Sequence, residues 1–144
     1  MIVQKPIPEN ILKDSVLAHV AAAYFSVGKK LERKTHCSAT RGFILSTLRD
    51  GAEPNQNQIA TQLGLDRTVV HRSIKTMVQE GLVAEKKAKS GRAILVRLTA
   101  KGDRYREFLI EQRRLADNKL SEELSTVERA TLLRLLQRVA EVEF

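Results

Sequence analysis

Five polar residues between positions 67 and 75 recur at a spacing that would let them contact one partner together. They are Arg67, Thr68, His71, Arg72 and Lys75. Separations of three and four residues bring side chains onto one face of a helix. Guanidinium, hydroxyl and ammonium groups on such a face are suited to hydrogen bonding with base edges in a DNA major groove. The alternative is that this face is an ordinary solvent-exposed surface with no partner. The other face carries Val70, Ile74, Met77 and Val78, so we expect it to pack on the protein core.

The residues just before this helix predict a shorter helix and a tight turn. Asn55 followed by Gln58 fits a capping box, which would open a helix running to about Gln62. Gly64 then allows the left-handed backbone of a turn. Asp66 can cap the next helix, which we predict to run to Glu80 and to stop at Gly81. A short helix, a glycine turn and a second helix form a helix-turn-helix.

A basic hairpin is predicted after that unit. Two apolar stretches, Leu82–Ala84 and Ile94–Leu98, flank a cationic, glycine-bearing segment at 86–92. Between Asp66 and Lys101 there are nine Lys or Arg residues against three Asp or Glu, which gives +6 of the chain's net charge of +8. Basic hairpin tips can reach a minor groove or its phosphates, so we predict that this segment contacts DNA too.

Helices are predicted on both sides of this central region. After an extended arm at Met1–Pro8, apolar residues recur at helical spacing over Glu9–Lys34, and a second helix is predicted over Thr40–Arg49. Helices are also predicted over Lys101–Leu120 and from Thr126 towards Glu143, the last opened by a capping box at Ser125 and Glu128. These stripes could form an internal core. Together they carry more apolar surface than a small domain made of the helix-turn-helix and the hairpin can cover. We therefore favour the interpretation that these helices form a dimer interface.

Composition excludes several classes of protein. In 144 residues there are 25 Lys or Arg and 17 Asp or Glu, a balance that favours polyanionic partners, nucleic acid before acidic membrane surfaces. Cys37 is the single cysteine and the three histidines are scattered, so neither a disulfide, a metal site nor a catalytic motif is expected. We expect no cofactor and no enzymatic activity. With no signal peptide or apolar membrane span, a cytoplasmic protein is expected.

The sequence resembles the MarR (multiple-antibiotic-resistance regulator) family. The resemblance rests on residues 58–83, with Gln58-Ile59-Ala60, Thr68-Val69-Val70-His71-Arg72-Ser73-Ile74 and Glu80-Gly81-Leu82-Val83, and on residues 91–102, with Leu98-Thr99-Ala100-Lys101-Gly102. It implies a mainly α winged helix-turn-helix fold with a small β-hairpin wing and dimerisation helices at both ends. Residues 37–100 would bind DNA, while residues 1–36 and 101–144 would form the dimerisation module.

The resemblance also implies a function and a set of contacts. The chain would act as a homodimeric transcriptional regulator, a repressor by expectation, on a near-palindromic double-stranded operator. Arg72 matches the arginine of the recognition helix and Arg92 the wing-tip arginine. The full predicted DNA-contacting set is Asn57, Arg67, Thr68, His71, Arg72, Lys75, Lys87, Lys89 and Arg92. Two positions depart from the family pattern: Ser90 replaces an aspartate, and His71 replaces Ser or Thr.

Sensing is predicted at the junction before the second helix. Relatives bind small anionic or aromatic molecules in a cleft bordered by this region, or respond to oxidation of a cysteine. His36, Cys37 and Arg41 lie there and form the predicted effector site, although for Cys37 we favour the alternative of an inert, partly buried thiol. His19 is interpreted as a core or interface histidine. The alternative function is a winged-helix module for non-specific DNA binding or for protein contacts.

Overall fold

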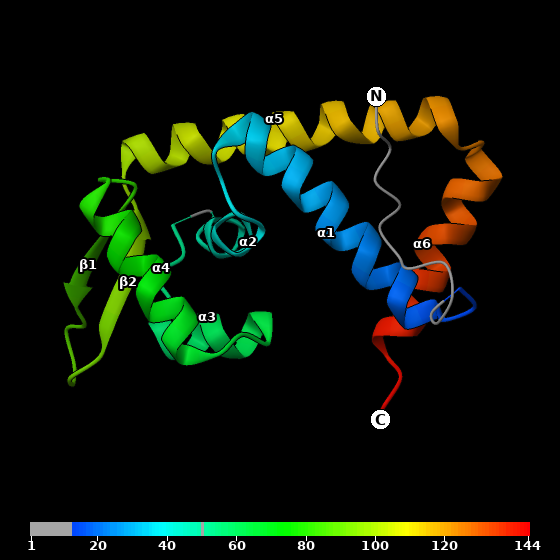
Figure 1. The fold of residues 1–144 in the computed structure, drawn as a ribbon. Helices are drawn as coiled ribbons and strands as arrows, with labels where there is room; N and C mark the ends of the chain where they lie inside the picture. Colours follow the sequence, from blue (N-terminus) through cyan, green and yellow to red (C-terminus); the bar gives the residue numbers. More distant parts are fainter. Residues whose placement is uncertain (1–12, 50) are drawn as a thin grey trace. The chain divides into compact units, whose positions relative to one another are not determined.

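The computed structural model describes residues 13–49 and 51–144, and Figure 1 shows the order of their helices and strands. The predicted arm at Met1–Pro8 and the first residues of the predicted first helix lie outside this range. The chain divides into two compact units, residues 1–109 and 110–144. Six helices and a two-stranded sheet are present in the described residues, which confirms the mainly α fold with a small hairpin.

The first helix begins later than the sequence pattern predicts. Helix α1 spans Val16–Thr35, and the side chain of Ser15 accepts a hydrogen bond from the N–H of Ala18 at 3.2 Å. A serine in this position supplies the N-cap, at which the helix begins. The prediction of a helix from Glu9 is therefore wrong at least for residues 13–15. His36 ends the helix in the left-handed region, at φ 55°.

Three further helices build the helix-turn-helix unit. Helix α2 spans Ala39–Thr47, two residues shorter at its C-terminus than predicted, and helix α3 spans Gln56–Leu63. Both hydrogen bonds of the predicted capping box are present, at 2.9 Å between Asn55 and Gln58. Gly64 takes φ 62° in the turn, and helix α4 follows at Arg67–Gln79 behind the cap of Asp66. Local signals therefore predicted this segment well.

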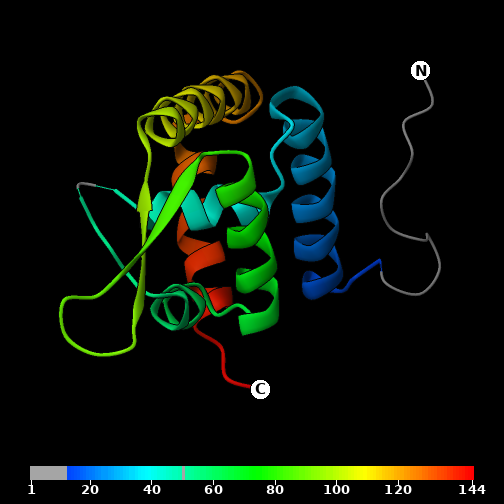
Figure 2. The same ribbon diagram turned by 90° about the vertical axis from the view of Figure 1, so that its left-hand side faces the viewer.

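The core of the first unit lies beneath α4. Val70, Ile74 and Met77 of α4 are completely buried and belong to one cluster with residues of α2, α3 and the hairpin. The other members of that cluster are Ile44, Leu45, Leu48, Ile59, Ala60, Leu82, Val83 and Val96. The prediction that Val78 shares the buried stripe is wrong, because its side chain is 38% exposed. In Figure 2, α3 and α4 lie beside the hairpin.

The first strand of the hairpin is longer than predicted. Strand β1 spans Val83–Lys87 and pairs antiparallel with β2 at Ile94–Leu98, with Val83 opposite Leu98 and Lys87 opposite Ile94. Lys86 and Lys87 therefore belong to the strand rather than to the tip. Backbone pairing overrides the low strand preference of lysine here, since β1 leaves these side chains exposed at the end of the ladder.

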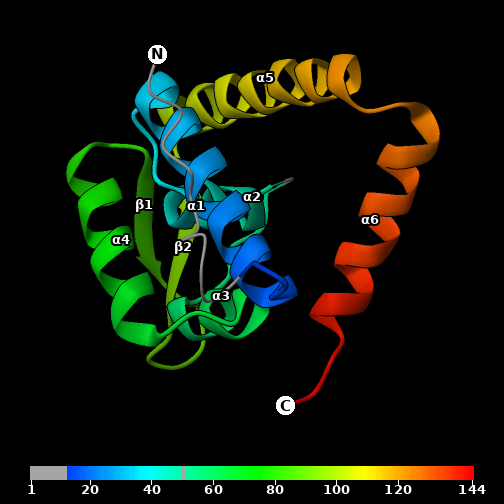
Figure 3. The ribbon, with the colours of Figure 1, turned by 45° about the vertical axis from the view of Figure 1, so that its right-hand side comes forward.

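The second unit is made of the end of one helix and the whole of another. Helix α5 spans Ala100–Glu123, and helix α6 spans Thr126–Ala140 after a short turn, which Figure 3 shows. The predicted capping box at Ser125 and Glu128 is present. No described residue from 110 onwards is fully buried, and several leucines of α6 are about half exposed. In the described residues, no helix is long and apolar enough to cross a membrane.

The start of α5 is packed tightly against the hairpin. Gly102 is buried, and a Cβ atom built there would overlap the carbonyl oxygen of Leu82 and approach its carbonyl carbon to 2.8 Å. Thr99 reinforces the junction, because its backbone N–H donates to the carbonyl of Leu82 at 3.1 Å. Only glycine allows α5 to come this close to the backbone of the hairpin.

We therefore expect Gly102→Ala to destabilise the fold. Overpacking against fixed backbone costs about 1–3 kcal/mol, and urea unfolding should show that loss in the free energy of unfolding. Gly42→Ala is the matched control, because that glycine is helical and nothing lies within 4 Å of the added Cβ. The control should be about 0.5–1 kcal/mol more stable, from helix propensity. Equal stability of the two variants would contradict the close packing described here.

Candidate nucleic-acid interface

The polar face of α4 is built as the sequence predicts. The side chains of Arg67, Thr68, His71, Arg72 and Lys75 are all exposed, while the opposite face is buried. Because α4 contacts α2, α3 and β1, the buried residues fix how the helix is rotated about its axis. Three cationic side chains, one hydroxyl and one imidazole thus share a solvent-facing surface.

Hydrogen bonds join this face to α3 and to the hairpin. Nδ1 of His71 lies 3.1 Å from Oε1 of Gln56, the first residue of α3. The amide Nε2 of Gln56 donates to Oε1 of Glu85 in β1 at 3.0 Å. Neither Gln56 nor Glu85 was among the predicted site residues. Their partners lie 15 and 29 residues away along the chain, so no local sequence pattern could have revealed these contacts. Asn57, which was predicted, is exposed on the same first turn of α3.

The cations of the hairpin are not equivalent. Lys86 forms an ion pair with Glu53 at 2.7 Å, which offsets its charge. Lys87, Lys89 and Arg92 are exposed and form no ion pair within residues 13–49 and 51–144. Gly91 takes φ 93° at the tip, between Lys89 and Arg92. The predicted wing residues therefore remain available to a polyanion, as does Arg97 of β2, which is also exposed and which the prediction left out.

The C-terminal end of α4 is held by three contacts. The guanidinium of Arg41 in α2 forms an ion pair with the carboxylate of Glu80, and its Nη1 lies 3.4 Å from Oε1. The ammonium of Lys101 donates to the backbone carbonyl of Glu80 at 2.7 Å, and the hydroxyl of Thr99 donates to that of Gly81 at 2.6 Å. These contacts connect α4 to α2 and to the start of α5.

The three residues predicted to sense an effector have different surroundings. Arg41 forms an ion pair with Glu80, and its buried Nε has no hydrogen-bond partner among the residues that the structure describes. Cys37 is buried, and its Sγ donates to the carbonyl of Ser38 at 3.5 Å. Burial raises the pKa of the Cys37 thiol, although a hydrogen bond with Tyr105 acts in the opposite direction. Burial also raises the pKa of Tyr105 to about 12. Since the thiolate is the reactive form of cysteine, this setting disfavours oxidation.

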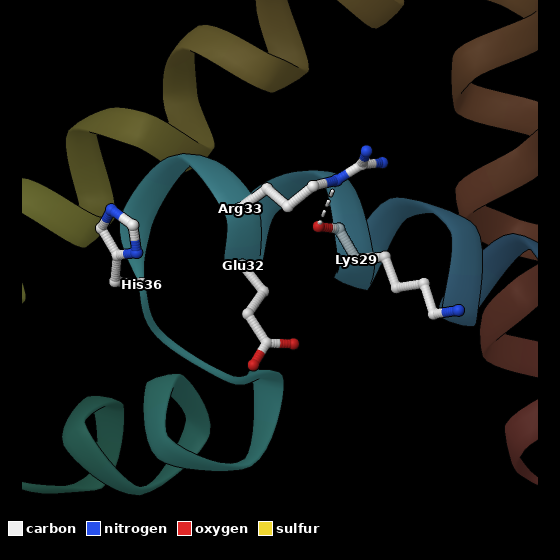
Figure 4. A pocket seen from close by; sticks show the side chains of 4 residues that line it. All are labelled: Lys29, Glu32, Arg33 and His36. Atoms are coloured by element: carbon white, nitrogen blue, oxygen red, sulfur yellow. Dashed lines mark hydrogen bonds between the residues drawn. The ribbon is translucent and has the colours of Figure 1, made fainter.

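His36, the C-cap of α1, differs from its neighbour Cys37 in that its side chain is exposed. It lines a pocket with Lys29, Glu32 and Arg33, which Figure 4 shows. Two of these four residues are permanently cationic at neutral pH, so the pocket suits an anion better than a cation. The core alternative for His19 is wrong, because its side chain is exposed and Nδ1 lies 2.7 Å from the carbonyl of Ser15. No metal-binding group of His, Cys, Asp and Glu occurs in the described part of the chain.

Comparison with known proteins supports the fold. Residues 38–87, about a third of the chain, match the model of the IclR helix-turn-helix domain. Comparison with curated protein sequences gives no significant match. Many solved structures resemble the chain.

Three of these similar proteins are transcriptional regulators. PcaV from Streptomyces coelicolor, in complex with its natural ligand, is 19% identical, with 94% of this chain and 99% of that chain covered and a TM-score of 0.81. The repressor CouR bound to p-coumaroyl-CoA is 21% identical, with coverages of 96% and 99% and a TM-score of 0.82. CouR is also known bound to a 23-mer DNA duplex, with a TM-score of 0.78. A MarR/EmrR family regulator from Acinetobacter sp. ADP1 is 19% identical, with coverages of 90% and 95% and a TM-score of 0.75. The chain therefore has the winged helix-turn-helix fold of such regulators.

Proposed function

We propose that this protein is a sequence-specific regulator of transcription of the MarR type, which binds a near-palindromic operator as a homodimer and represses it. One observation carries the proposal: α4 buries Val70, Ile74 and Met77 completely on one side. Its solvent-facing surface is made of Arg67, Thr68, His71, Arg72 and Lys75. A helix so divided can enter a major groove while its buried face holds it on the domain. The DNA-bound structure of CouR, which has the same fold, supports this use.

In this proposal the helix and the hairpin have separate tasks. Arg67 and its neighbours on α4 read base edges, because arginine can hold a guanine through two hydrogen bonds. Lys87, Lys89 and Arg92 contact phosphates or the adjacent minor groove, which contributes affinity and register but little sequence choice. The exposure of these cations supports that role, as does the excess of positive charge between residues 66 and 101.

Dimerisation is proposed from apolar surface that is exposed on the described helices of the single chain. In α1, Phe25 is 66% exposed, and in α6 Leu133 is 55% exposed. Leu132, Leu135 and Leu136 of α6 are also exposed. Such a density of exposed large side chains is unusual for a monomer and typical of a surface that another chain covers. Helices α1, α5 and α6 of a second copy are the proposed cover, and the two copies would present two copies of α4 to DNA.

Release by a small aromatic or anionic effector is the proposed mode of control. PcaV and CouR are each known with a small-molecule ligand, which supports the idea for this fold. Arg41 and His36 are the proposed partners of an effector carboxylate. A carboxylate that reached Arg41 would compete with Glu80, so binding would loosen the end of the recognition helix. Oxidation of Cys37 is the rival trigger, which the raised pKa of its thiol disfavours.

The second candidate function is a winged-helix module that coats DNA without sequence choice or binds other proteins. The observation that favours it is the excess of exposed cations on the hairpin, which would bind any phosphate backbone. The two candidates differ in one measurable quantity, the ratio of affinities for selected and random duplexes at several salt concentrations.

Replacing a wing cation and a helix residue should therefore have different effects on DNA binding. Lys89→Ala should weaken all duplexes alike and reduce the slope of log K against log salt by about 1. Arg67→Ala should change the preferred sequence, with a loss of about 1–3 kcal/mol at one base pair. Binding titrations on selected and random duplexes measure both. Lys119→Ala, which removes the same charge from the second unit, is the control. Unchanged affinity and preference in Arg67→Ala would refute the proposed role of α4.

The apolar surface of α6 should hold the dimer together. We expect sedimentation to give a dimer at micromolar concentration, and Leu132→Glu or Leu136→Glu to dissociate it, because a buried unpaired charge costs several kcal/mol. Gln137→Glu is the matched control, since it adds the same charge on the polar side of α6 and should leave the dimer intact. A wild-type monomer at that concentration would contradict the proposed assembly.

The effector hypothesis can be tested on preformed complexes with the selected duplex. Salicylate should weaken wild-type binding, and a tenfold loss corresponds to about 1.4 kcal/mol of preference for the DNA-free state. Glu80→Gln should respond at lower salicylate concentration, because Arg41 no longer has a carboxylate partner, and Arg41→Gln should respond weakly. Hydrogen peroxide should have little effect on either wild type or Cys37→Ser. A peroxide response lost in Cys37→Ser would establish oxidation as the trigger instead.

A further inference from the structure

A hydrogen-bonded relay runs from the recognition helix to the hairpin. It joins three side chains: His71 of α4, Gln56 of α3 and Glu85 of β1. The distances are 3.1 Å between Nδ1 of His71 and Oε1 of Gln56, and 3.0 Å between Nε2 of Gln56 and Oε1 of Glu85. Each element contributes one residue, so the relay depends on the folded arrangement of the first unit.

The carboxylate at one end determines where the protons lie. An ionised glutamate only accepts hydrogen bonds, so the amide nitrogen of Gln56 must face Glu85. The amide oxygen of Gln56 then faces His71. Because that oxygen cannot donate, Nδ1 of His71 must carry the proton. The opposite arrangement would set two acceptors against each other 3.1 Å apart. In the neutral imidazole, Nε2 is consequently left as a hydrogen-bond acceptor.

The second nitrogen of the ring is available to a partner. Nε2 forms no hydrogen bond with any residue in the described ranges, and the His71 side chain is exposed. Its neighbours one turn away on α4 are Arg67 and Lys75, whose charged groups only donate. Helix α3 contributes no charged side chain, and Glu85 is reached only through Gln56. His71 therefore places an acceptor within a surface of donors.

We infer that the relay makes His71 a selective reader of the base that it faces in the major groove, favouring a base with an exocyclic amine, adenine N6 or cytosine N4, over guanine or thymine on the same strand. This inference rests on the proposed function, because it requires α4 to face DNA bases. An acceptor at Nε2 favours those amino groups and is repelled by the acceptor edge of guanine, O6 and N7. Gln56 and Glu85 are positioning residues, which act on the base only through the tautomer of His71.

A single substitution can reverse the polarity of the relay. In Glu85→Gln the new amide can donate to Gln56, so the Gln56 amide can turn over and donate to Nδ1 of His71. Nε2 would then carry the proton and become a donor, which suits guanine. Glu53→Gln is the matched control: it removes the same charge from a carboxylate that pairs with the adjacent Lys86, outside the relay.

Two measurements test the inference on the full-length protein. Long-range ¹H–¹⁵N spectra of the DNA-free protein report which ring nitrogen is protonated, and His71→Gln identifies the His71 signals among three histidines. Selection from a randomised duplex pool reports base preference. We expect Nδ1–H in wild type and Glu53→Gln, with adenine or cytosine favoured over guanine by about tenfold at one position. Glu85→Gln should show the Nε2–H form and lose or invert that preference.

The outcomes separate this inference from the proposed function. An Nε2–H tautomer in the wild type overturns the relay, even if the protein binds its duplex selectively. An Nδ1–H tautomer with the same base preference in wild type and Glu85→Gln overturns the reading role of His71. If no duplex is selected at all, both the proposed function and the reading role fail, and the tautomer spectrum then shows whether the relay itself exists.

Discussion

Burial of the apolar side of α4 is the interaction on which the rest of the first unit depends. Val70, Ile74 and Met77 have no solvent exposure and pack in the cluster that also holds Ile44, Ile59 and Val96. Fixing these three side chains leaves α4 one rotational setting, and that setting turns Arg67, His71 and Lys75 outwards. A helix made only of polar residues could present the same groups, but nothing would hold them in one orientation. The chemistry of the surface thus follows from the packing behind it.

Polar contacts also help to position α4, and they act at different points along the helix. Near its middle, His71 is joined through Gln56 to the hairpin, while at its C-terminal end Glu80 is joined to α2 through Arg41 and to α5 through Lys101. Side-chain pairs at the surface contribute little to stability by themselves. Their importance here is positional, because each one couples α4 to a different neighbour. A change in the position of α2 or of the hairpin would therefore shift α4.

Local signals in the sequence predicted the helices and turns well, whereas contacts between distant residues were missed. Asn55, Gly64, Asp66 and Ser125 act through neighbours two to four residues away, so their roles can be read directly from the chain. The exposed face of α4 was predicted from periodicity in the same way. The pairing of Arg41 with Glu80 and of Gln56 with Glu85 depends on how elements meet in space, which periodicity does not encode. The predicted start of α1 was too early for a related reason: the apolar spacing continues on the N-terminal side of Ser15, although Ser15 is the cap at which the helix begins.

The chemical nature of the caps has a consequence for the behaviour of the helices in acid. The box that opens α3 consists of two neutral amides, Asn55 and Gln58, whereas α4 is capped by a carboxylate and the cap of α6 includes one. The hydrogen bond from the backbone N–H of Thr68 lowers the pKa of Asp66, and the hydroxyl of Ser125 lowers that of Glu128. A carboxylate with a lowered pKa stabilises the fold above its ordinary pKa, and this contribution disappears as the pH falls through the folded value. Acidification would therefore fray the first turns of α4 and α6 while the start of α3 keeps its cap.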